Sequence, residues 1–370
     1  MKLIFAGNTA WSMYNFRRFV FQHFIKQGHE VIVLAPHDNE YQPLIMSLGC
    51  KFYPIQIEGK GRNPFKDIHT ILQFRKILKK EKPDCCFFYT IKPNIYGSLA
   101  AASLHIPYIP ITTGLGYIFL TDNLISKIAQ TLYKIAFKKA PQVWFLNEED
   151  AKTFVSRKLI RKKQARILKG EGINVDYFEV HNEYTETSFL LVARMLWDKG
   201  VGEFVEAATK LKKKYPEVKF QLLGFLGVNN PNAISQEQMD QWIKEGNIEY
   251  LGATNDVRPF LYQSSCVVLP SFYREGIPFS LMEGAAAGKP LIATNNIGCK
   301  EVITQDETGF LVKKRDAEDL AKAMEKIILM PKEKRIDMGL KGRQKIQKEF
   351  GLPIIIEQYN QIIYNLTKLK

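Results

Sequence analysis

The sequence predicts an α/β protein made of two doubly wound, Rossmann-like domains. Short apolar runs, each as long as a buried strand, alternate with helical patterns in both halves of the chain. Such alternation indicates a parallel sheet covered by helices on both faces. The pattern lapses into polar residues at 173–187, "INVDYFEVHNEYTET", and then restarts. A length of 370 residues also favours two domains over one, so we expect the boundary at this lapse.

The first domain is expected over residues 1–180. Its strands are expected at 2–8, 30–36, 50–57, 84–91, 108–114 and 142–147. Helical patterns lie between most of these strands, at 16–27, 64–80, 94–104 and 125–138. The opening "MKLIFAGNTAW" has only a short apolar run before Gly7. It therefore predicts a first strand rather than a signal peptide, and a cytoplasmic protein.

The second domain is expected over residues 181–370, with a last helix that can pack back on the first domain. Its strands are expected at 188–194, 219–225, 248–252, 265–271, 290–295 and 309–313. Its helices are expected at 202–215, 256–264, 280–287 and 317–329. In open α/β sheets, ligands bind beyond the carboxyl ends of the strands. Two such domains facing each other would hold one active site in the cleft between them.

The composition is that of a soluble globular protein, with 46% hydrophobic and 24% charged residues. No apolar run reaches the roughly 18 residues that a membrane span requires. The five cysteines are an odd number without metal-ligand spacing, which indicates buried, reduced thiols. The charge is uneven: residues 1–180 carry 26 Lys+Arg and 14 Asp+Glu, whereas residues 181–370 carry 26 and 24. A basic first half predicts an anionic partner: nucleic acid, an anionic membrane face or a diphosphate-bearing substrate.

A glycine-containing turn and a helix start stand out at 273–288, "YREGIPFSLMEGAAAG". Pro278 suits the first helical position, and a helix N-terminus after such a turn is a ready anion site. Gly276 would let a phosphate approach the backbone. Glu283 lies about 7–8 Å further along the axis, too far to cap the helix. As acceptor-only groups, Glu283 and Glu275 suit the hydroxyls of a ribose and a sugar. The alternative is that both are solvated surface charges.

Two cations occur where the first strand of the second domain meets its helix, in "VARMLWDKG" (192–200). Arg194 and Lys199 would lie on the ligand side of the sheet and could neutralise a diphosphate without a metal. The alternative, solvated charges near a helix start, is weakened because cations there oppose the helix dipole.

These motifs together resemble the retaining GT-B glycosyltransferases of family GT4. The resemblance covers the whole chain and rests on "EGIPFSLME" with its E-x7-E spacing, "ARMLWDKG", "GEGINVDYF" (170–178) and "GFLV" (309–312). It implies that Arg194 and Lys199 contact the diphosphate, Glu275 the donor sugar and Glu283 the ribose. The backbone of Gly276, Ile277, Pro278, Phe279 and Ser280 would complete the diphosphate site. The resemblance implies no metal and no other cofactor, and the six histidines are scattered.

The first half is most similar to the branch of the family that acts on bacterial polyprenyl-diphosphate-linked oligosaccharides, which includes N-acetylgalactosaminyl-type transferases. The segments that carry this similarity are the first loop, "RNPF" (62–65), "IYGSLAA" (95–101), "TTGLGYIF" (112–119) and "LYKIAFKKA" (132–140). The first loop has Gly7-Asn8 where many relatives have two glycines. The histidine that many relatives carry after the fourth strand is absent from "YTIKPN". Asn8, Arg17, Lys92 and Asn94 are therefore only weak candidates for acceptor binding.

Aromatic residues and cations are interleaved at 11–24, "WSMYNFRRFVFQHF", and further cations follow from Arg62 to Lys80. Rings with cations suit the interface of an anionic membrane. The alternative places Phe16, Phe19, Val20 and Phe24 in the core at helical spacing, with the cations merely solvated.

The reading that follows is a retaining glycosyltransferase at the inner face of the plasma membrane. It would move a sugar, an N-acetylhexosamine, from a UDP-sugar to a lipid-diphosphate-linked saccharide. A UDP-sugar 2-epimerase of the same fold is one alternative, since it shares the two-domain architecture. A basic nucleic-acid-binding protein is the other, although the sequence holds no recognisable nucleic-acid motif.

Overall fold

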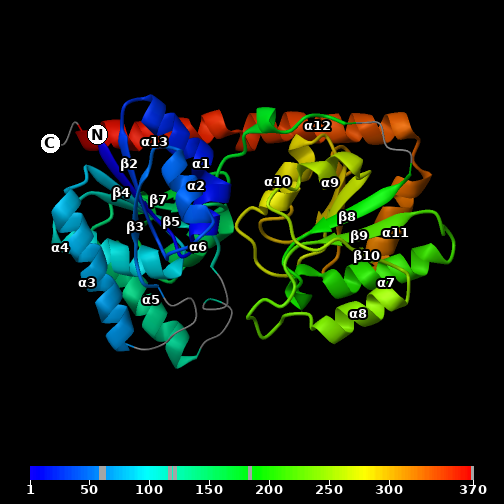
Figure 1. Ribbon diagram of the computed structural model, residues 1–370, viewed down its shortest axis with the longest axis horizontal. Coiled ribbons are helices and arrows are strands. Elements are labelled where there is room, and N and C mark those ends of the chain that lie inside the picture. The colour runs from blue at the N-terminus through cyan, green and yellow to red at the C-terminus, as the bar shows by residue number, and fades with distance from the viewer. Residues whose placement is uncertain (58–63, 116–118, 120–122, 182–185, 368–370) are drawn as a thin grey trace. The chain divides into compact units, whose positions relative to one another are not determined.

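The computed structural model describes residues 1–57, 64–115, 119, 123–181 and 186–367 (Figure 1). The chain divides into two compact units, one of Met1–Gly172 with Leu352–Lys370 and the other of Ile173–Gly351. The chain thus passes from the first unit to the second at residues 172–173, where the polar segment begins, rather than at residue 180. The last helix belongs to the first unit. Arg62 and residues 116–118 and 182–185 of the motifs above lie outside the described residues.

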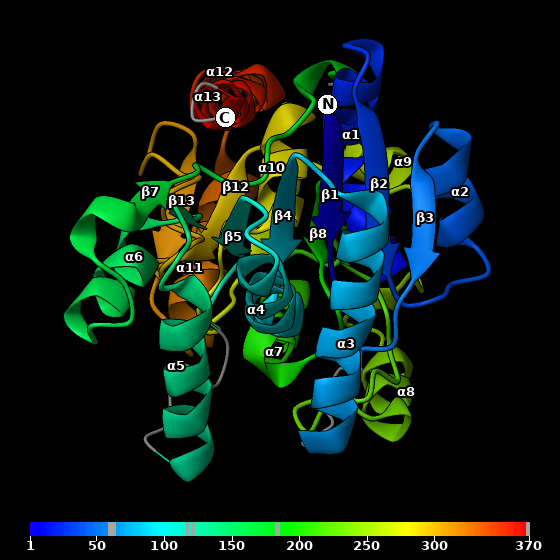
Figure 2. The same cartoon turned by 90° about the vertical axis from the view of Figure 1, so that its left-hand side faces the viewer.

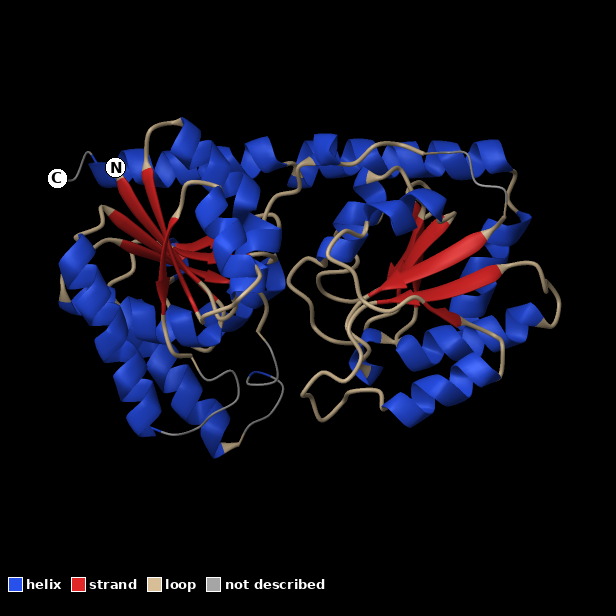
Figure 3. Cartoon of the chain, in the orientation of Figure 1, coloured by secondary structure: helices blue, strands red, loops and turns tan. Residues whose placement is uncertain are grey.

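In the part of the first unit that is described, seven parallel strands form a sheet in the order β3-β2-β1-β4-β5-β6-β7. Figure 3 draws the strands of both units in red. The strands are β1 (Lys2–Ala6), β2 (Glu30–Ala35), β3 (Lys51–Pro54), β4 (Cys85–Tyr89), β5 (Tyr108–Thr112), β6 (Val143–Phe145) and β7 (Ala165–Ile167). The helices are α1 (Ala10–Lys26), α2 (Tyr41–Ser47), α3 (Pro64–Glu81), α4 (Ser98–Ser103), α5 (Leu124–Phe137), α6 (Glu148–Ser156) and α13 (Leu352–Thr367). A π-helical turn, Pro93–Gly97, precedes α4.

Alternate residues of these strands enter different cores, because successive side chains point to opposite faces of a sheet. Figure 2 shows α3, α4 and α5 beside one another on one face, where Phe88 meets Phe74 and Tyr108. On the other face, Phe5 and Phe87 stack at 5.0 Å between ring centres and pack against Tyr359 of α13. β4 is buried along its whole length, as expected of an uninterrupted apolar strand covered on both faces.

The second unit repeats this topology. Within its described residues, six parallel strands run in the order β10-β9-β8-β11-β12-β13. They are β8 (Ser188–Val192), β9 (Lys219–Leu223), β10 (Glu249–Tyr250), β11 (Cys266–Leu269), β12 (Leu291–Thr294) and β13 (Gly309–Val312). The helices are α7 (Val201–Lys212), α8 (Gln236–Lys244), α9 (Arg258–Gln263), α10 (Phe279–Ala286), α11 (Ala317–Leu329) and α12 (Lys332–Phe350).

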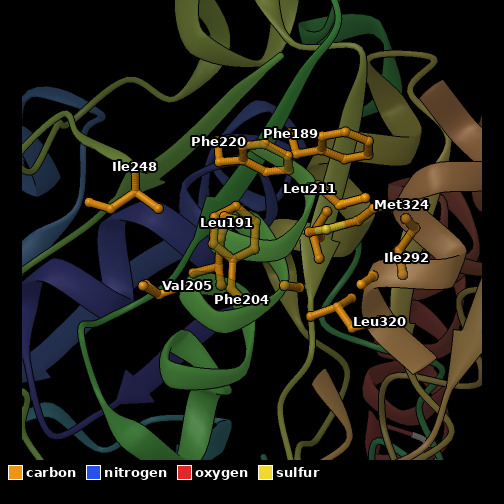
Figure 4. Close-up of a cluster of buried hydrophobic side chains, with 14 of the residues drawn as sticks. Phe189, Leu191, Phe204, Val205, Leu211, Phe220, Ile248, Ile292, Leu320 and Met324 are labelled. Atoms are coloured by element: carbon orange, nitrogen blue, oxygen red, sulfur yellow. The ribbon is translucent and has the colours of Figure 1, made fainter. Parts of the chain in front are cut away.

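The core of the second unit lies between the sheet and the helices α7 and α11. Figure 4 shows Phe189 and Phe220, from adjacent strands, with their rings stacked 5.4 Å apart. Phe204 of α7 and Met324 of α11 close this cluster, and all four side chains are buried. Burial of such side chains contributes about 1.5–3 kcal/mol each.

When strands are numbered within each unit, the second sheet has the order 3-2-1-4-5-6, and the first sheet has the same order with a seventh strand after the sixth. This is the order of the doubly wound dinucleotide-binding fold, and it reverses direction between the first and fourth strands. The prediction of two doubly wound α/β domains is confirmed. The reversal points, β1 with β4 and β8 with β11, are where such sheets bind ligands.

Two further expectations concern cysteines and membranes. All five cysteines are described, and each is a buried free thiol, as predicted. Among the described helices, none has the length and apolarity that crossing a bilayer demands.

Candidate functional site

The sequence-predicted donor residues fall at the reversal point of the second sheet. β8 ends at Val192, shortly before Arg194, and β11 ends at Leu269, shortly before the turn that holds Glu275. Parallel strands place both ends at one edge of the sheet. Gly200 permits close contact there: its φ is +75°, and a Cβ on it would lie 2.2 Å from the carbonyl oxygen of Pro270. The loops after β8 and β11 are therefore pressed together.

Lys199 and Glu275 form an ion pair across these two loops. The ammonium of Lys199 contacts Oε1 of Glu275, and it lies 5.7 Å from the ring centre of Tyr273. The hydroxyl of Ser271 donates to the same Oε1 at 2.8 Å. The side chains of the pair are only 15% and 11% exposed, so the two charges neutralise each other in a largely dry environment. Two residues that the sequence analysis predicts separately, 76 positions apart, are thus direct neighbours.

Arg194 differs from Lys199 in its surroundings. It is exposed on the loop that leaves β8, and the described part of the chain contains no ion pair to its guanidinium. A planar guanidinium with five N–H donors is well suited to phosphate oxygens. Arg194 can therefore offer its charge to a ligand at this edge, whereas the ammonium of Lys199 is already paired with Glu275.

The helix start predicted at Pro278 begins one residue later. Pro278 is the N-cap, with extended backbone angles, and α10 runs from Phe279 to Ala286. Gly276, Ile277 and Pro278 are buried, whereas Phe279 and Ser280 of the first turn are half-buried. No acidic residue occupies this first turn. The first N–H groups of a helix have no partner within the helix as a rule, and together with the helix dipole they favour an anion. Glu283, the fifth helical residue, is half-buried.

The first sheet reverses between β1 and β4, and the acceptor candidates lie around that point. Asn8 lies two residues after the end of β1 and is half-buried. Lys92 lies three residues after β4; its ammonium pairs with Asp67 at 2.9 Å and lies 5.9 Å from the ring centre of Tyr96. Asn94 is buried, and its amide spans the backbone of Ile111, donating to the carbonyl at 2.9 Å and accepting from the N–H at 3.1 Å. Asn94 thus ties the π-helical turn to β5.

The expectation that Arg17 is a surface cation is wrong. Its side chain is 3% exposed, and its guanidinium pairs with Glu171, lies 3.8 Å from the ring centre of Tyr89 and donates to the Ser12 carbonyl at 2.9 Å. Burial raises the pKa of Glu171, and the charge of Arg17 opposes that rise. The ion pair explains the burial, because a guanidinium leaves water only for a compensating partner. The core interpretation of the neighbouring residues is confirmed for Val20 and Phe24, which are fully buried.

Some residues that hold this site were missed in the sequence analysis. Thr294 and Asn296, at and after the end of β12, donate to backbone carbonyls of the loop that carries Glu275. The carbonyl of Asp198 accepts from the N–H groups of Phe272 and Tyr273, at 3.1 and 3.2 Å. Their positions in the sequence were the available signal. Thr294 and Asn296 lie at and just after the carboxyl end of β12, and Asp198 directly precedes Lys199.

The chain is similar to known proteins in both of its halves. The model of the family "Glycosyl transferases group 1" matches residues 176–345, and that of "Glycosyl transferase 4-like" matches residues 2–147. The chain is also 31% identical to the N,N'-diacetylbacillosaminyl-diphospho-undecaprenol alpha-1,3-N-acetylgalactosaminyltransferase of Campylobacter jejuni, over 100% of both proteins. The chain belongs to the group 1, GT4 glycosyltransferases.

Solved structures show the fold of this glycosyltransferase. A glycosyltransferase from Rickettsia africae has a TM-score of 0.82 at 18% identity, over 100% of this chain and 99% of that one. HepE of Anabaena, solved in complex with UDP, has a TM-score of 0.80 at 14% identity, over 99% and 100%. The predicted GT-B fold and glycosyltransferase activity are therefore confirmed, and the roles of individual residues stay predictions.

Proposed function

We propose that this glycosyltransferase transfers an N-acetylhexosamine from a UDP-sugar to a lipid-diphosphate-linked saccharide, with retention of the anomeric configuration. The observation that carries the proposal is the full-length similarity to a transferase whose name specifies a diphospho-undecaprenol acceptor. A likeness in fold to a protein solved with UDP supports the choice of donor.

The donor would bind at the carboxyl edge of the second sheet. Arg194, Lys199 and the N–H groups of the first turn of α10 would hold the diphosphate. Glu283 would accept hydrogen bonds from the ribose and Glu275 from the transferred sugar, because ionised carboxylates are acceptors only. A diphosphate beside Lys199 would share its ammonium with Glu275, because the ammonium has three N–H donors. The first turn of α10 contains no acidic side chain that would repel the diphosphate.

The chemical step would be a front-face displacement. The bond between the anomeric carbon and the diphosphate breaks while an acceptor hydroxyl attacks from the same face. The hydroxyl proton passes to the departing diphosphate oxygen. The cations and the helix start act on the charge that develops on the leaving group, and preorganised groups of this kind are worth about 10²–10³ in rate each.

The acceptor would bind to the first unit, with Asn8 and Lys92 at its reversal point as contacts. Membrane contact at the cytoplasmic face would use α5 rather than α1, whose Phe21 and Phe24 are buried. On α5, Leu124, Ile128 and Ile135 are 72%, 53% and 56% exposed, with exposed lysines between and after them. Apolar side chains flanked by cations suit an anionic lipid surface.

A nucleotide-release screen tests the proposal. Purified protein would be offered UDP- and GDP-sugars, each with and without a short polyprenyl-diphosphate saccharide. We expect release of UDP from an N-acetylhexosamine donor only when the saccharide is present, with an α-linked product. Conversion of the UDP-sugar without acceptor would favour the epimerase instead. Failure of every UDP-sugar would contradict the proposal.

A further inference from the structure

The loop that carries Glu275 is held by a residue outside the predicted site. Ser271 is fully buried in the segment after β11, and its hydroxyl lies 2.8 Å from Oε1 of Glu275. The same hydroxyl lies 3.2 Å from the carbonyl oxygen of Asp198. A hydroxyl has one proton and donates to one of them at a time, and the shorter distance and the negative charge favour the carboxylate.

A second segment, 294–298, fixes the backbone on either side of this contact. The Thr294 hydroxyl donates to the carbonyl of Ser271, and the Asn296 amide donates to that of Tyr273 at 2.7 Å. The N–H of Glu275 donates to the carbonyl of Ile297 at 3.3 Å. The backbone is therefore bonded at residues 271, 273 and 275. These hydrogen bonds hold the backbone, and the Ser271 hydroxyl acts on the carboxylate end of Glu275.

Gly298 lets this segment come close. Its φ is +88°, and a Cβ on it would lie 2.5 Å from the carbonyl oxygen of Gly276 and 2.6 Å from Cβ of Glu275. Any larger residue would push the two loops apart. The close approach limits how far the base of the Glu275 side chain can shift.

We propose that Ser271 is a positioning residue that sets the direction of the Glu275 carboxylate. The inference rests on the proposed function, in which Glu275 receives a hydroxyl of the donor sugar. The Lys199 ammonium is a point charge on a long, flexible side chain, and a bound diphosphate would also attract it. The Ser271 hydroxyl is on a short, buried side chain, so its hydrogen bond keeps Oε1 in place when the ammonium moves. A misplacement of about 1 Å in such a site can cost on the order of 10² in rate.

The test compares Ser271→Ala with Ser264→Ala. Ser264 is also fully buried in the second unit, and its hydroxyl donates to the Leu261 carbonyl at 2.9 Å rather than to a predicted site residue. With the donor and acceptor found by the screen, we expect Ser271→Ala to lower kcat about tenfold or more. The donor KM and the Kd of UDP should change less than about threefold, and Ser264→Ala should retain kcat within about twofold. Thermal unfolding of both variants checks that the fold is intact.

A second pair of variants removes the effect of shape. Ser271→Thr and Ser271→Val add the same bulk, but only threonine keeps the hydroxyl. We expect the threonine variant to exceed the valine variant in kcat about tenfold. Equal kcat in that pair, or a loss in Ser271→Ala no larger than in Ser264→Ala, would overturn the role of Ser271 and leave the proposed function standing. A wild-type protein that neither binds UDP nor turns over a UDP-sugar would overturn both.

Discussion

Replacing Arg17 by methionine should destabilise the first unit by about 3–5 kcal/mol, because it leaves the buried carboxylate of Glu171 without its cation. Methionine keeps most of the apolar stem that packs inside the unit, so the charge is the main thing removed. A domain is stable by about 5–15 kcal/mol, so the loss is a large share of the total. With a denaturant dependence of about 2 kcal/mol/M, a loss of 4 kcal/mol moves the urea midpoint by about 2 M.

Urea unfolding should be followed by hydrogen–deuterium exchange of peptides from β1 and β4, which report on the first unit alone. Arg18→Met is the matched control, since Arg18 is half-buried and its guanidinium lies over the rings of Tyr14 and Phe19. We expect it to cost less than about 1 kcal/mol. The double variant Arg17→Met/Glu171→Leu should recover at least half of the loss, because an apolar pair of similar volume replaces the ion pair.

The pH dependence provides an independent check. Burial raises the pKa of Glu171, and loss of Arg17 removes the charge that opposes the rise. A raised carboxyl pKa means that the folded state holds its proton more tightly than the unfolded state, so stability falls as pH rises between the two pKa values. The deficit of Arg17→Met should therefore be smaller at pH 5 than at pH 8. Arg17→Met and Arg18→Met with equal midpoints at pH 8 would refute the reasoning.

Three further predictions concern charged groups elsewhere. Lys199→Met should lower kcat about 10²–10³-fold and weaken UDP binding measured by calorimetry, because a cation at the leaving group is lost; near-normal turnover would remove Lys199 from the diphosphate site. Burial alone would raise the pKa of Glu81, but hydrogen bonds from Lys51, Tyr53 and Lys2 outweigh burial and lower it to about 2. The lowered pKa contributes about 3 kcal/mol of stability, which is present above pH 4.5 and lost as pH falls towards 2. Glu81→Gln should therefore be less stable at pH 7, and the difference should vanish in acid unfolding near pH 2. Burial lowers the pKa of Lys289 from 10.5 to about 8. Between pH 8 and 10.5 the unfolded state therefore binds one more proton than the folded state, and the stability of the wild type should rise with pH. Thermal unfolding of Lys289→Met should show a flatter rise.

The positions of most strands, and the edge of the second sheet at which the predicted donor residues lie, could be predicted from the sequence because both depend on local signals. An uninterrupted apolar run such as "CCFFY" has few ways to be buried other than as a central parallel strand. The topology then brings the ends of β8 and β11 to one edge, which places Arg194, Lys199 and Glu275 together without knowledge of any distance. Helix α12 was missed, because its sequence is rich in charge and its apolar spacing is weak, whereas the last helix, α13, was expected.

The contacts of single polar residues could not be predicted, because each partner is distant in the sequence. The sequence predicts that Asn94 is a polar residue near the ligand edge, whereas its amide forms two hydrogen bonds with the backbone of Ile111. Arg17 reads as one of two adjacent surface cations, yet its partner Glu171 follows 154 positions later. Burial of a polar side chain depends on whether the fold supplies a partner, and only the assembled sheet determines that.

The two reversal points differ in how their polar residues are used. At the second, Lys199, Glu275 and Ser271 form a connected network, and the exposed Arg194 supplies the positive charge that the ion pair does not cancel. At the first, Asn94 hydrogen-bonds to the backbone of Ile111 and Arg17 pairs with Glu171. Lys92 forms an ion pair with Asp67. The excess positive charge of the first half is therefore carried by other surface cations, such as the exposed lysines of α5. A field spread over a surface favours a large anionic partner over a compact one. This agrees with a donor bound by specific contacts to the second unit and an acceptor held through its lipid-diphosphate end by the first.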